Sequence, residues 1–347
     1  MGSYYEACTL SGDVFISFTI IATLVTFFWR GTWDMLDAFL IPTNYALSLW
    51  VSFVGGSFLH MILAILQNTL NVTFTPEKLS SFGFCVVSRL HAYLAAFLQV
   101  CQWRGFWGLL DIYGIANWIT LLLPILVLSV LGSMSQTTGP PLAVVHDLDQ
   151  QDYFTVAPII DTDCRPGWLA ILSGASFYVL LITNLGIAYW RGVWSVLDVH
   201  VFPEDLVRSA AFSLALSIFL ALPILTGEQY IREFCRNKYR NRIVRTFVEK
   251  AYITVASLVA INHWRGVWYI QISFLLPDNP HMSAIISHFV GIAGLMTLFV
   301  SRTAAGVNSF DDRDIYGGKP GLFTLAYTSR ICKLKDDNSS YIVPVSV

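Results

Sequence analysis

The sequence is short of charged side chains. Asp, Glu, Lys and Arg together make up 13% of its 347 residues, whereas soluble domains carry about 25%. Hydrophobic residues make up 55% of the chain, and its mean hydropathy is +0.60. A soluble core cannot hold that much apolar surface at this length, so lipid is predicted to cover it. The net charge of −2 gives no basic excess that would favour nucleic-acid binding.

Metal-binding and catalytic patterns are also missing. The six cysteines are scattered, with no CxxC pair and no Cys/His cluster, so no metal site and no cofactor is predicted. No Ser/His/Asp order, HExxH motif, P-loop or GxGxxG loop holds up. His60 and His288 fall inside apolar runs without a mid-run carboxylate as partner, and His60 is predicted to be a hydrogen-bonded packing residue. The sequence therefore predicts a protein that is not an enzyme.

What the sequence does contain is long apolar runs. A helix needs about 17–25 mostly apolar residues to cross a bilayer, and eight segments reach or approach that length. They are roughly Val14–Trp29, Tyr45–Leu66, Phe84–Trp103, Trp118–Met134, Trp168–Trp190, Leu206–Leu225, Ala251–Trp264 and Met282–Val300. The predicted fold is an all-α polytopic membrane bundle with eight transmembrane helices.

Polar segments divide the chain into four parts. Residues 1–134 are predicted to form a first membrane half with helices one to four, and residues 167–301 a second half with helices five to eight. Residues 135–166 are predicted to be an acidic cytosolic linker, and residues 302–347 a loosely ordered cytosolic tail.

A five-residue motif, Trp-Arg-Gly-x-Trp, occurs four times, beginning at Trp29, Trp103, Trp190 and Trp264. The first and third copies are 161 residues apart, and so are the second and fourth. Chance does not place so rare a pattern four times at matching helix ends, so the pattern indicates a helix–motif–helix unit that doubled twice. Because each unit holds two helices, the two halves are predicted to be parallel pseudo-repeats about an axis along the membrane normal.

The candidate site consists of the motif residues and an aspartate that follows three copies. The members are Trp29, Arg30, Gly31, Trp33, Asp37, Trp103, Arg104, Gly105, Trp107, Asp111, Trp190, Arg191, Gly192, Trp194, Asp198, Trp264, Arg265, Gly266 and Trp268, with Ile272 in the place of a fourth aspartate. A proline also follows three copies, at Pro42, Pro203 and Pro277, and the second copy has Ala116 there.

Helical spacing gives each motif residue a physical role. If the helix continues through the motif, both tryptophans lie on one face. The glycine allows either a bend or the close approach of a neighbouring helix. Seven residues separate arginine and aspartate within a repeat, about 10 Å along the axis, so each arginine is predicted to pair with an aspartate of an adjacent repeat.

Two uses of the motifs remain open. The tryptophans and arginines either pin the helix ends to lipid headgroups, or they form a functional patch. Such a patch would be an anion-binding rim or a docking surface for a partner.

The basic loop at residues 228–250 sets the predicted orientation. It carries seven Lys and Arg residues, so the positive-inside rule places it in the cytosol with both termini, and places the motifs outside. The glycosylation sequon at Asn71 points the other way, because its loop then becomes cytosolic.

The last residues, Val345, Ser346 and Val347, resemble a peptide that binds a PDZ protein, and an unstructured tail is the alternative.

Four Trp-Arg-Gly-x-Trp copies after helices in an eight-pass chain resemble the Fuseless family of animal membrane proteins, over about residues 14–300. The resemblance implies a presynaptic plasma-membrane protein that organises voltage-gated calcium channels at the active zone, through the channel or an active-zone scaffold, and so supports synaptic transmission. It carries over no catalytic residues. The rival readings are a transporter or channel for a small solute or ion, and a lipid-binding or lipid-moving protein.

Overall fold

The computed structural model describes residues 11–148, 152–156, 168–237, 241–306 and 327, and every regular element within these ranges is helical. The first helix, Ser11–Phe39, includes η1 (Ser17–Ile21) and α2 (Ala22–Phe39). α3 (Tyr45–Thr73), α4 (Ser81–Ile112) and α5 (Asn117–Leu131) follow. The segment Trp168–His200 comprises α6 (Trp168–Ser176), η3 (Phe177–Ile182) and α7 (Thr183–His200), and it leads to α8 (Leu206–Arg236), α9 (Arg242–Phe274) and α10 (Pro280–Thr297). The all-α class is confirmed.

Five of these helices are long and apolar enough to cross a membrane: Ser11–Phe39, Tyr45–Thr73, Ser81–Ile112, Trp168–His200 and Leu206–Arg236. Large apolar side chains stand exposed on the outer faces, such as Phe82, Val130 and Phe219. Exposed apolar surface on this scale marks contact with lipid or with a partner. The helices are therefore compatible with a membrane protein, whereas the number of eight crossings stays a prediction.

The helices that carry the motifs are longer than the sequence predicted. The expected ends at the first tryptophans were wrong, because the helices run on to Phe39, Ile112, His200 and Phe274. Polar motif residues do not end a helix when neighbouring helices satisfy them, and each motif arginine has such partners, described below. α9 is also extended toward its N-terminus, where it begins at Arg242.

The connections that follow the motif helices share a tight turn. Ile41, Phe202 and Leu276 each adopt positive φ directly before a proline, and Asn44, Asp205 and Asn279 then cap the next helix with their side chains. In the second copy, which lacks the proline, Gly114 takes the positive φ instead. Glycine adopts this conformation without a steric cost, which accounts for the different sequence of that connection.

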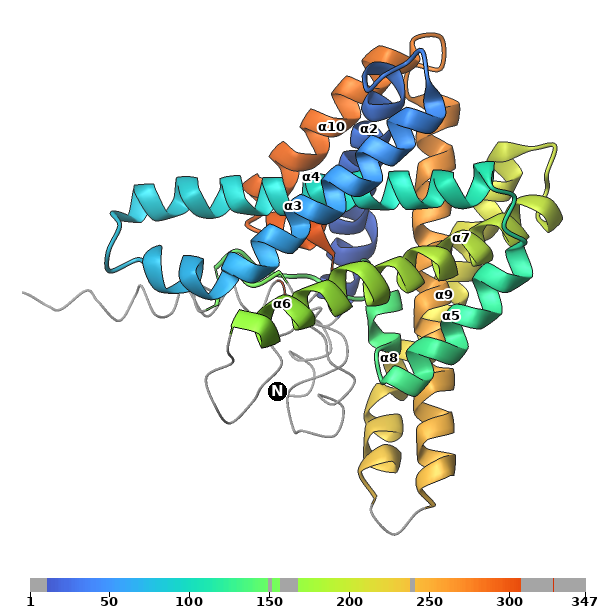
Figure 1. Ribbon diagram of the computed structural model, residues 1–347. Helices are drawn as coiled ribbons and strands as arrows, with labels where there is room; N and C mark the ends of the chain where they lie inside the picture. Colours follow the sequence, from blue (N-terminus) through green and yellow to red (C-terminus); the bar gives the residue numbers. More distant parts are fainter. Residues whose placement is uncertain (1–10, 149–151, 157–167, 238–240, 307–326, 328–347) are drawn as a thin grey trace, which may run out of the picture.

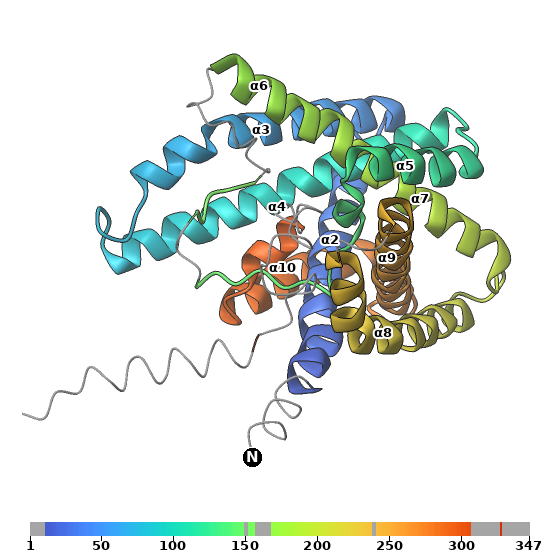
Figure 2. The same cartoon turned by 90° about the horizontal axis from the view of Figure 1, so that it is seen from below.

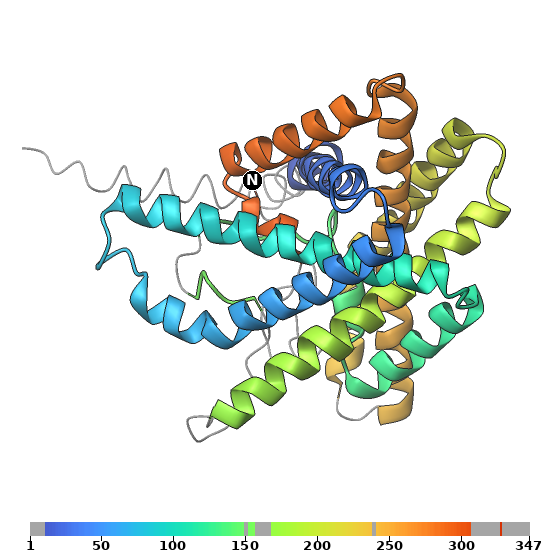
Figure 3. The same ribbon diagram turned by 45° about the horizontal axis from the view of Figure 1, so that its top comes forward.

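The motif helices α2, α4, α7 and α9 lie inside, and the other long helices pack around them (Figures 1 and 3). α3 packs on α4, α5 on α7, α8 on α9, and α10 on α2. Each outer helix thus packs on the motif helix of the next repeat, and the last one closes onto the first. Figure 2 shows α9 nearly end-on, with α2, α7 and α8 beside it.

Two segments outside the long helices fill the centre at the end away from the motif connections. One contains η2 (Met134–Thr137) and the residues up to 148, and the other contains η4 (Ser301–Ala305). Leu142, Ala143 and Val144 are buried, and Val145 and Thr303 exchange two hydrogen bonds. Most of the described part of the predicted linker is therefore packed inside the molecule, whereas Asp152 is exposed.

Candidate functional site

The first tryptophans of the four motifs form a closed ring. Trp29, Trp103, Trp190 and Trp264 meet edge to face around it, with centroids 5.1–5.4 Å apart and interplanar angles of 79–89°. This is the preferred aromatic geometry, because the positive edge of one ring meets the negative face of the next, and each pair contributes about 0.5–1.5 kcal/mol beyond burial. The inner ring, as we call it, ties the four motif helices together.

The second tryptophans repeat this arrangement one helical turn further on. Trp33, Trp107, Trp194 and Trp268 have centroids 5.8–5.9 Å apart and interplanar angles of 85–90°. The members of this outer ring are all partly exposed. The wider spacing and the exposure show that the two rings open toward the C-terminal ends of the motif helices.

The central segments close the opposite end of the rings. The indole N–H groups of Trp29, Trp190 and Trp264 donate to the carbonyl oxygens of Ala304, Thr137 and Pro140, at 2.7, 2.8 and 2.7 Å. Among the described residues, the indole nitrogen of Trp103 has no hydrogen-bond partner. Three of the four inner indoles thus hold the chain that covers them.

A cavity of about 180 Å³ lies between the rings. Its walls are aromatic throughout: the eight motif tryptophans and Tyr269. The Tyr269 hydroxyl accepts a hydrogen bond from the Trp194 indole at 3.1 Å and donates one to Asp198. The structure therefore brings the motif tryptophans together into a single site. From the sequence, they were predicted only to lie on one face of each helix.

The four motif arginines are buried, with exposed fractions of 3% for Arg30, 0% for Arg104, 5% for Arg191 and 1% for Arg265. Their guanidinium groups bond to neighbouring helices. A buried and bonded guanidinium neither reaches lipid headgroups nor forms an open anion-binding rim. The arginines therefore act neither as anchors to lipid headgroups nor as an anion-binding rim, two of the uses that the sequence left open.

The predicted pairing of adjacent repeats is confirmed at three positions. Arg104 meets Asp37 at 2.8 Å, Arg191 meets Asp111 at 2.7 Å, and Arg265 meets Asp198 at 2.9 Å. The aspartate side chains remain 37–50% exposed. Each pair joins the motif helix of one repeat to the motif helix of the next.

The fourth junction is closed differently. Since Ile272 stands where the other repeats have aspartate, Arg30 has no carboxylate partner on α9 and pairs instead with Asp34 on its own helix, at 2.9 Å. Arg30 still donates to Ser283 and Ser287 on α10. The departure of the fourth copy is thus compensated by a residue of the first.

The motif glycines are sites of close helix approach. A Cβ on Gly105 would lie 2.3 Å from the Phe53 nitrogen, and one on Gly31 would lie 2.2 Å from the His288 nitrogen. Gly192 and Gly266 are similarly close to α5 and α8. Of the two predicted uses of the glycine, the close approach is the one observed.

Sequence reasoning missed the hydroxyl groups that complete the arginine sites. Arg104 donates to Ser48, Arg265 to Ser209 and Ser213, and Arg191 to Thr120. Ser48, Ser209 and Ser283 stand at the same distance along the chain from the first tryptophan of their repeats. Extending the repeat comparison into the second helix of each unit would have found these three serines, but not Thr120, which lies two residues earlier in its repeat.

Asp147 is a second buried polar centre that the sequence did not single out. Its carboxylate accepts hydrogen bonds from the Ser301 backbone at 2.6 Å, the Ser301 hydroxyl at 2.7 Å and the Arg302 backbone at 3.0 Å. Arg89 of α4 pairs with it at 3.2 Å. One carboxylate therefore joins the segment between the halves to the segment after α10.

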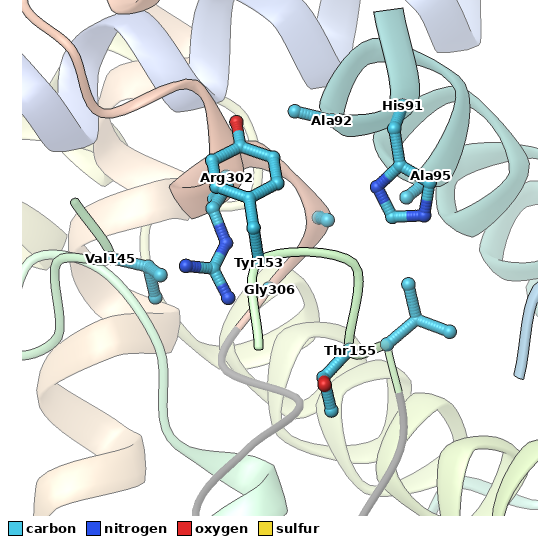
Figure 4. Close-up of a pocket in the computed structure, with 10 residues that line it drawn as sticks. His91, Ala92, Ala95, Val145, Tyr153, Thr155, Arg302 and Gly306 are labelled. Atoms are coloured by element: carbon cyan, nitrogen blue, oxygen red, sulfur yellow. The ribbon is translucent and has the colours of Figure 1, made fainter. Parts of the chain in front are cut away.

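Tyr153 supports this centre by donating to Asp147 at 3.2 Å. Burial, followed by the charge of Asp147, raises the pKa of Tyr153 to about 12, so the phenol stays protonated. The Arg302 guanidinium lies 4.7 Å from the centre of its ring, and both face His91 across a cavity of about 30 Å³ (Figure 4). That volume holds about one water molecule.

The remaining sequence-predicted residues lie apart from the rings. His60 is buried and hydrogen bonded to Gln102 at 3.3 Å, as a packing residue would be. Asn71 donates to Thr155 at 3.1 Å and accepts from the Phe154 backbone at 2.8 Å. Val345, Ser346 and Val347 lie outside the described residues.

Residues 9–304 match the model of the family described as Fuseless. The match includes all four motifs and their outer helices. No curated protein and no solved structure matches the chain.

Proposed function

Since the chain belongs to the Fuseless family, we propose that it is a non-enzymatic protein of the presynaptic plasma membrane. It organises voltage-gated calcium channels at the active zone and so supports synaptic transmission. The observation that carries this proposal is the self-contained centre, in which the motif arginines, glycines and inner tryptophans are all engaged with this chain. A rigid hub with apolar outer faces suits an organiser that presents surfaces to lipid and to other helices.

In this proposal the chain crosses the membrane eight times, as four parallel repeats of two helices. Matching contacts at three repeat junctions and the closure of α10 onto α2 support the repeat order. The basic ends of α8 and α9, with both termini, face the cytosol, and the ring mouth faces outward. The PDZ-binding tail then lies on the cytosolic side, where scaffold proteins are found.

The outer helices are the proposed docking surface for channel or scaffold helices. Trp50 of α3 is 42% exposed, Trp118 of α5 is 65% exposed and Phe219 of α8 is 70% exposed. Without water between helices, association in lipid rests on packing and on polar contacts. Aromatic side chains give such a surface a large contact area.

The test is the density of voltage-gated calcium channels at active zones, imaged in neurons with and without the protein. We expect the channel signal to fall without it and to recover with the intact chain. A chain with Trp50 and Trp118 changed to Leu, which leaves both rings intact, should reach the membrane but restore the signal poorly. Normal channel density in the absence of the protein would contradict the organiser proposal.

The central cavity favours a second candidate, a transporter or channel for a small solute. Against it, the inner end of the cavity is covered by the segments that accept the indole hydrogen bonds. Purified protein in liposomes separates the two proposals, because a transporter moves solute or ions by itself, whereas an organiser gives no flux above protein-free liposomes.

A further inference from the structure

We propose that the cavity between the tryptophan rings binds a small organic cation with a methylated ammonium head. This ligand site goes beyond the organising role and does not depend on it. All nine side chains that line the cavity are aromatic. Aromatic faces attract cations through their quadrupole, Trp most strongly, and cages of such rings recognise quaternary ammonium groups.

The indole hydrogen bonds leave the inner cavity wall without an exposed donor on three sides. Trp29, Trp190 and Trp264 each direct the N–H toward a backbone carbonyl of the covering segments. What these residues present to the cavity is ring surface. These three residues offer no free N–H group to an anion, and the indole nitrogen of Trp103, which has no partner among the described residues, is itself buried. The ring surface desolvates a methylated cation at little cost because that head makes no strong hydrogen bonds with water.

The size of the cavity selects a small ligand. It measures about 180 Å³, whereas drug-sized ligands occupy about 300–1,000 Å³ and an engineered apolar cavity of about 150 Å³ accepts benzene. A trimethylammonium or tetramethylammonium head is of the size that such a space admits. A longer substituent on the ammonium group would extend through the outer ring toward solvent.

Charge at the mouth favours a cation. Asp37, Asp111 and Asp198 lie one helical turn beyond the outer-ring tryptophans and are 37–50% exposed, while their arginine partners are 0–6% exposed. The carboxylate is therefore the more exposed member of each ion pair. Asp198 also accepts from the hydroxyl of Tyr269, which lines the cavity.

Two sources carry this chemistry: a free choline-like molecule and the headgroup of a phosphatidylcholine lipid. To separate them, the full chain is placed in nanodiscs made of phosphatidylethanolamine and phosphatidylglycerol, which lack choline. Binding of radiolabelled choline is then measured against protein-free nanodiscs. A parallel sample in phosphatidylcholine nanodiscs shows whether the lipid headgroup occupies the site, since binding of free choline would then be lost.

Competition in the choline-free nanodiscs tests the charge requirement. We expect saturable binding that tetramethylammonium displaces and that 3,3-dimethylbutan-1-ol, the neutral isostere of choline, does not displace. Equal displacement by the isostere would reduce the site to an apolar cavity and overturn the proposal. Absence of saturable binding to folded protein in these nanodiscs would overturn it as well.

Variants locate the site. Trp107→Leu removes one outer-ring face and should weaken choline binding about tenfold, while Trp118→Leu, on the exposed face of α5, should leave it unchanged. If Trp107→Leu does not fold, Trp107→Phe keeps an aromatic face and should bind about threefold more weakly than Trp. A folded ring variant that binds choline like the original chain would show that the ligand sits elsewhere.

Discussion

At three of the repeat junctions, one arginine both pairs with the preceding motif helix and donates to the neighbouring outer helix. Arg104 neutralises Asp37 of the preceding motif helix and donates to Ser48 at the start of the outer helix that packs against it. A buried guanidinium is costly unless its donors are paired. The arginine therefore holds the neighbouring helices in place and also depends on them for its hydrogen-bond acceptors. This mutual dependence explains why the loss of an aspartate at Ile272 comes with a substitute at Asp34.

The coupling between Arg104 and Asp37 can be measured by a double-mutant cycle. Arg104→Ala, Asp37→Ala and the double variant should give a coupling free energy of about 1–2 kcal/mol, since the arginine is buried and the aspartate only partly exposed. The matched control is the exposed pair of Arg208 and Asp205, for which about 0.5 kcal/mol is expected. Thermal unfolding in detergent measures both. Additive effects at the Arg104 pair would remove the ion pair as a link between repeats.

At the scale of the helix, substitution by alanine is expected to change stability in opposite directions at two glycines, Gly105 and Gly55. Gly105→Ala places a methyl group against the backbone of Phe53, and the displacement should lower the free energy of unfolding by about 1–3 kcal/mol. Gly55→Ala on α3 meets nothing within 4 Å, so the better helix propensity of Ala should raise stability by up to about 1 kcal/mol. The unfolding temperatures of the two variants should move in opposite directions, and a neutral Gly105→Ala would mean that the helices are not in close contact there.

A second prediction at this scale concerns the segments held by Asp147. Asp147→Asn removes the charge that pairs with Arg89 and accepts three hydrogen bonds from Ser301 and Arg302. Hydrogen bonds to a charged group contribute about 1.5–3 kcal/mol, so the unfolding temperature should drop clearly. The control Asp152→Asn changes an exposed residue at positive φ, which Asn tolerates. Protease sensitivity of residues 132–148 should rise only in the Asp147 variant.

The helices and the ion pairs between motif helices could be predicted from the sequence, whereas the tryptophan rings at the centre of the molecule could not. Apolar runs located the helical segments. The seven-residue spacing favoured ion pairs between adjacent repeats over pairs within one repeat, and the structure shows that Asp37 is the partner of Arg104. The ends were misplaced because Arg30 and its equivalents look like interfacial residues until their buried partners are known. The ring of Trp29, Trp103, Trp190 and Trp264 depends on contacts across the whole chain, and no local pattern specifies those.

At the scale of the whole molecule, the motif helices and the outer helices packed on them close into a circle around a cavity that is covered at one end. The order of packing, from α3 on α4 to α10 on α2, returns to its beginning. Each repeat packs against its neighbours, so the loss of one junction is expected to destabilise the other junctions as well. The segments of Thr137 and Ala304 enter from one end and leave the other end of the rings accessible.

Because only one end of the rings is accessible, the orientation of the protein in the membrane decides which compartment that end faces, and this orientation can be tested. Parallel repeats place the connections near Tyr113 and Asp278 on one side and the connection near Glu77 on the other, and all three residues are exposed. Single cysteines at these positions, in a chain whose native cysteines Cys8, Cys85, Cys101, Cys164, Cys235 and Cys332 are changed to serine, can be labelled on intact cells with an impermeant maleimide. Tyr113→Cys and Asp278→Cys should both react, and Glu77→Cys should react only after permeabilisation.

The labelling pattern separates two parts of the structural proposal. If Tyr113→Cys and Asp278→Cys react on opposite sides, the four repeats do not share one orientation, and the rings could not face a single compartment. If all three positions react with inverted sidedness, the repeats are parallel but the basic ends of α8 and α9 face outward, against the positive-inside rule. A glycan on Asn71 would then accompany the inversion, although the folded chain holds that amide against Phe154 and Thr155. With the expected pattern, the ring mouth opens to the outside, where a soluble organic cation would reach it.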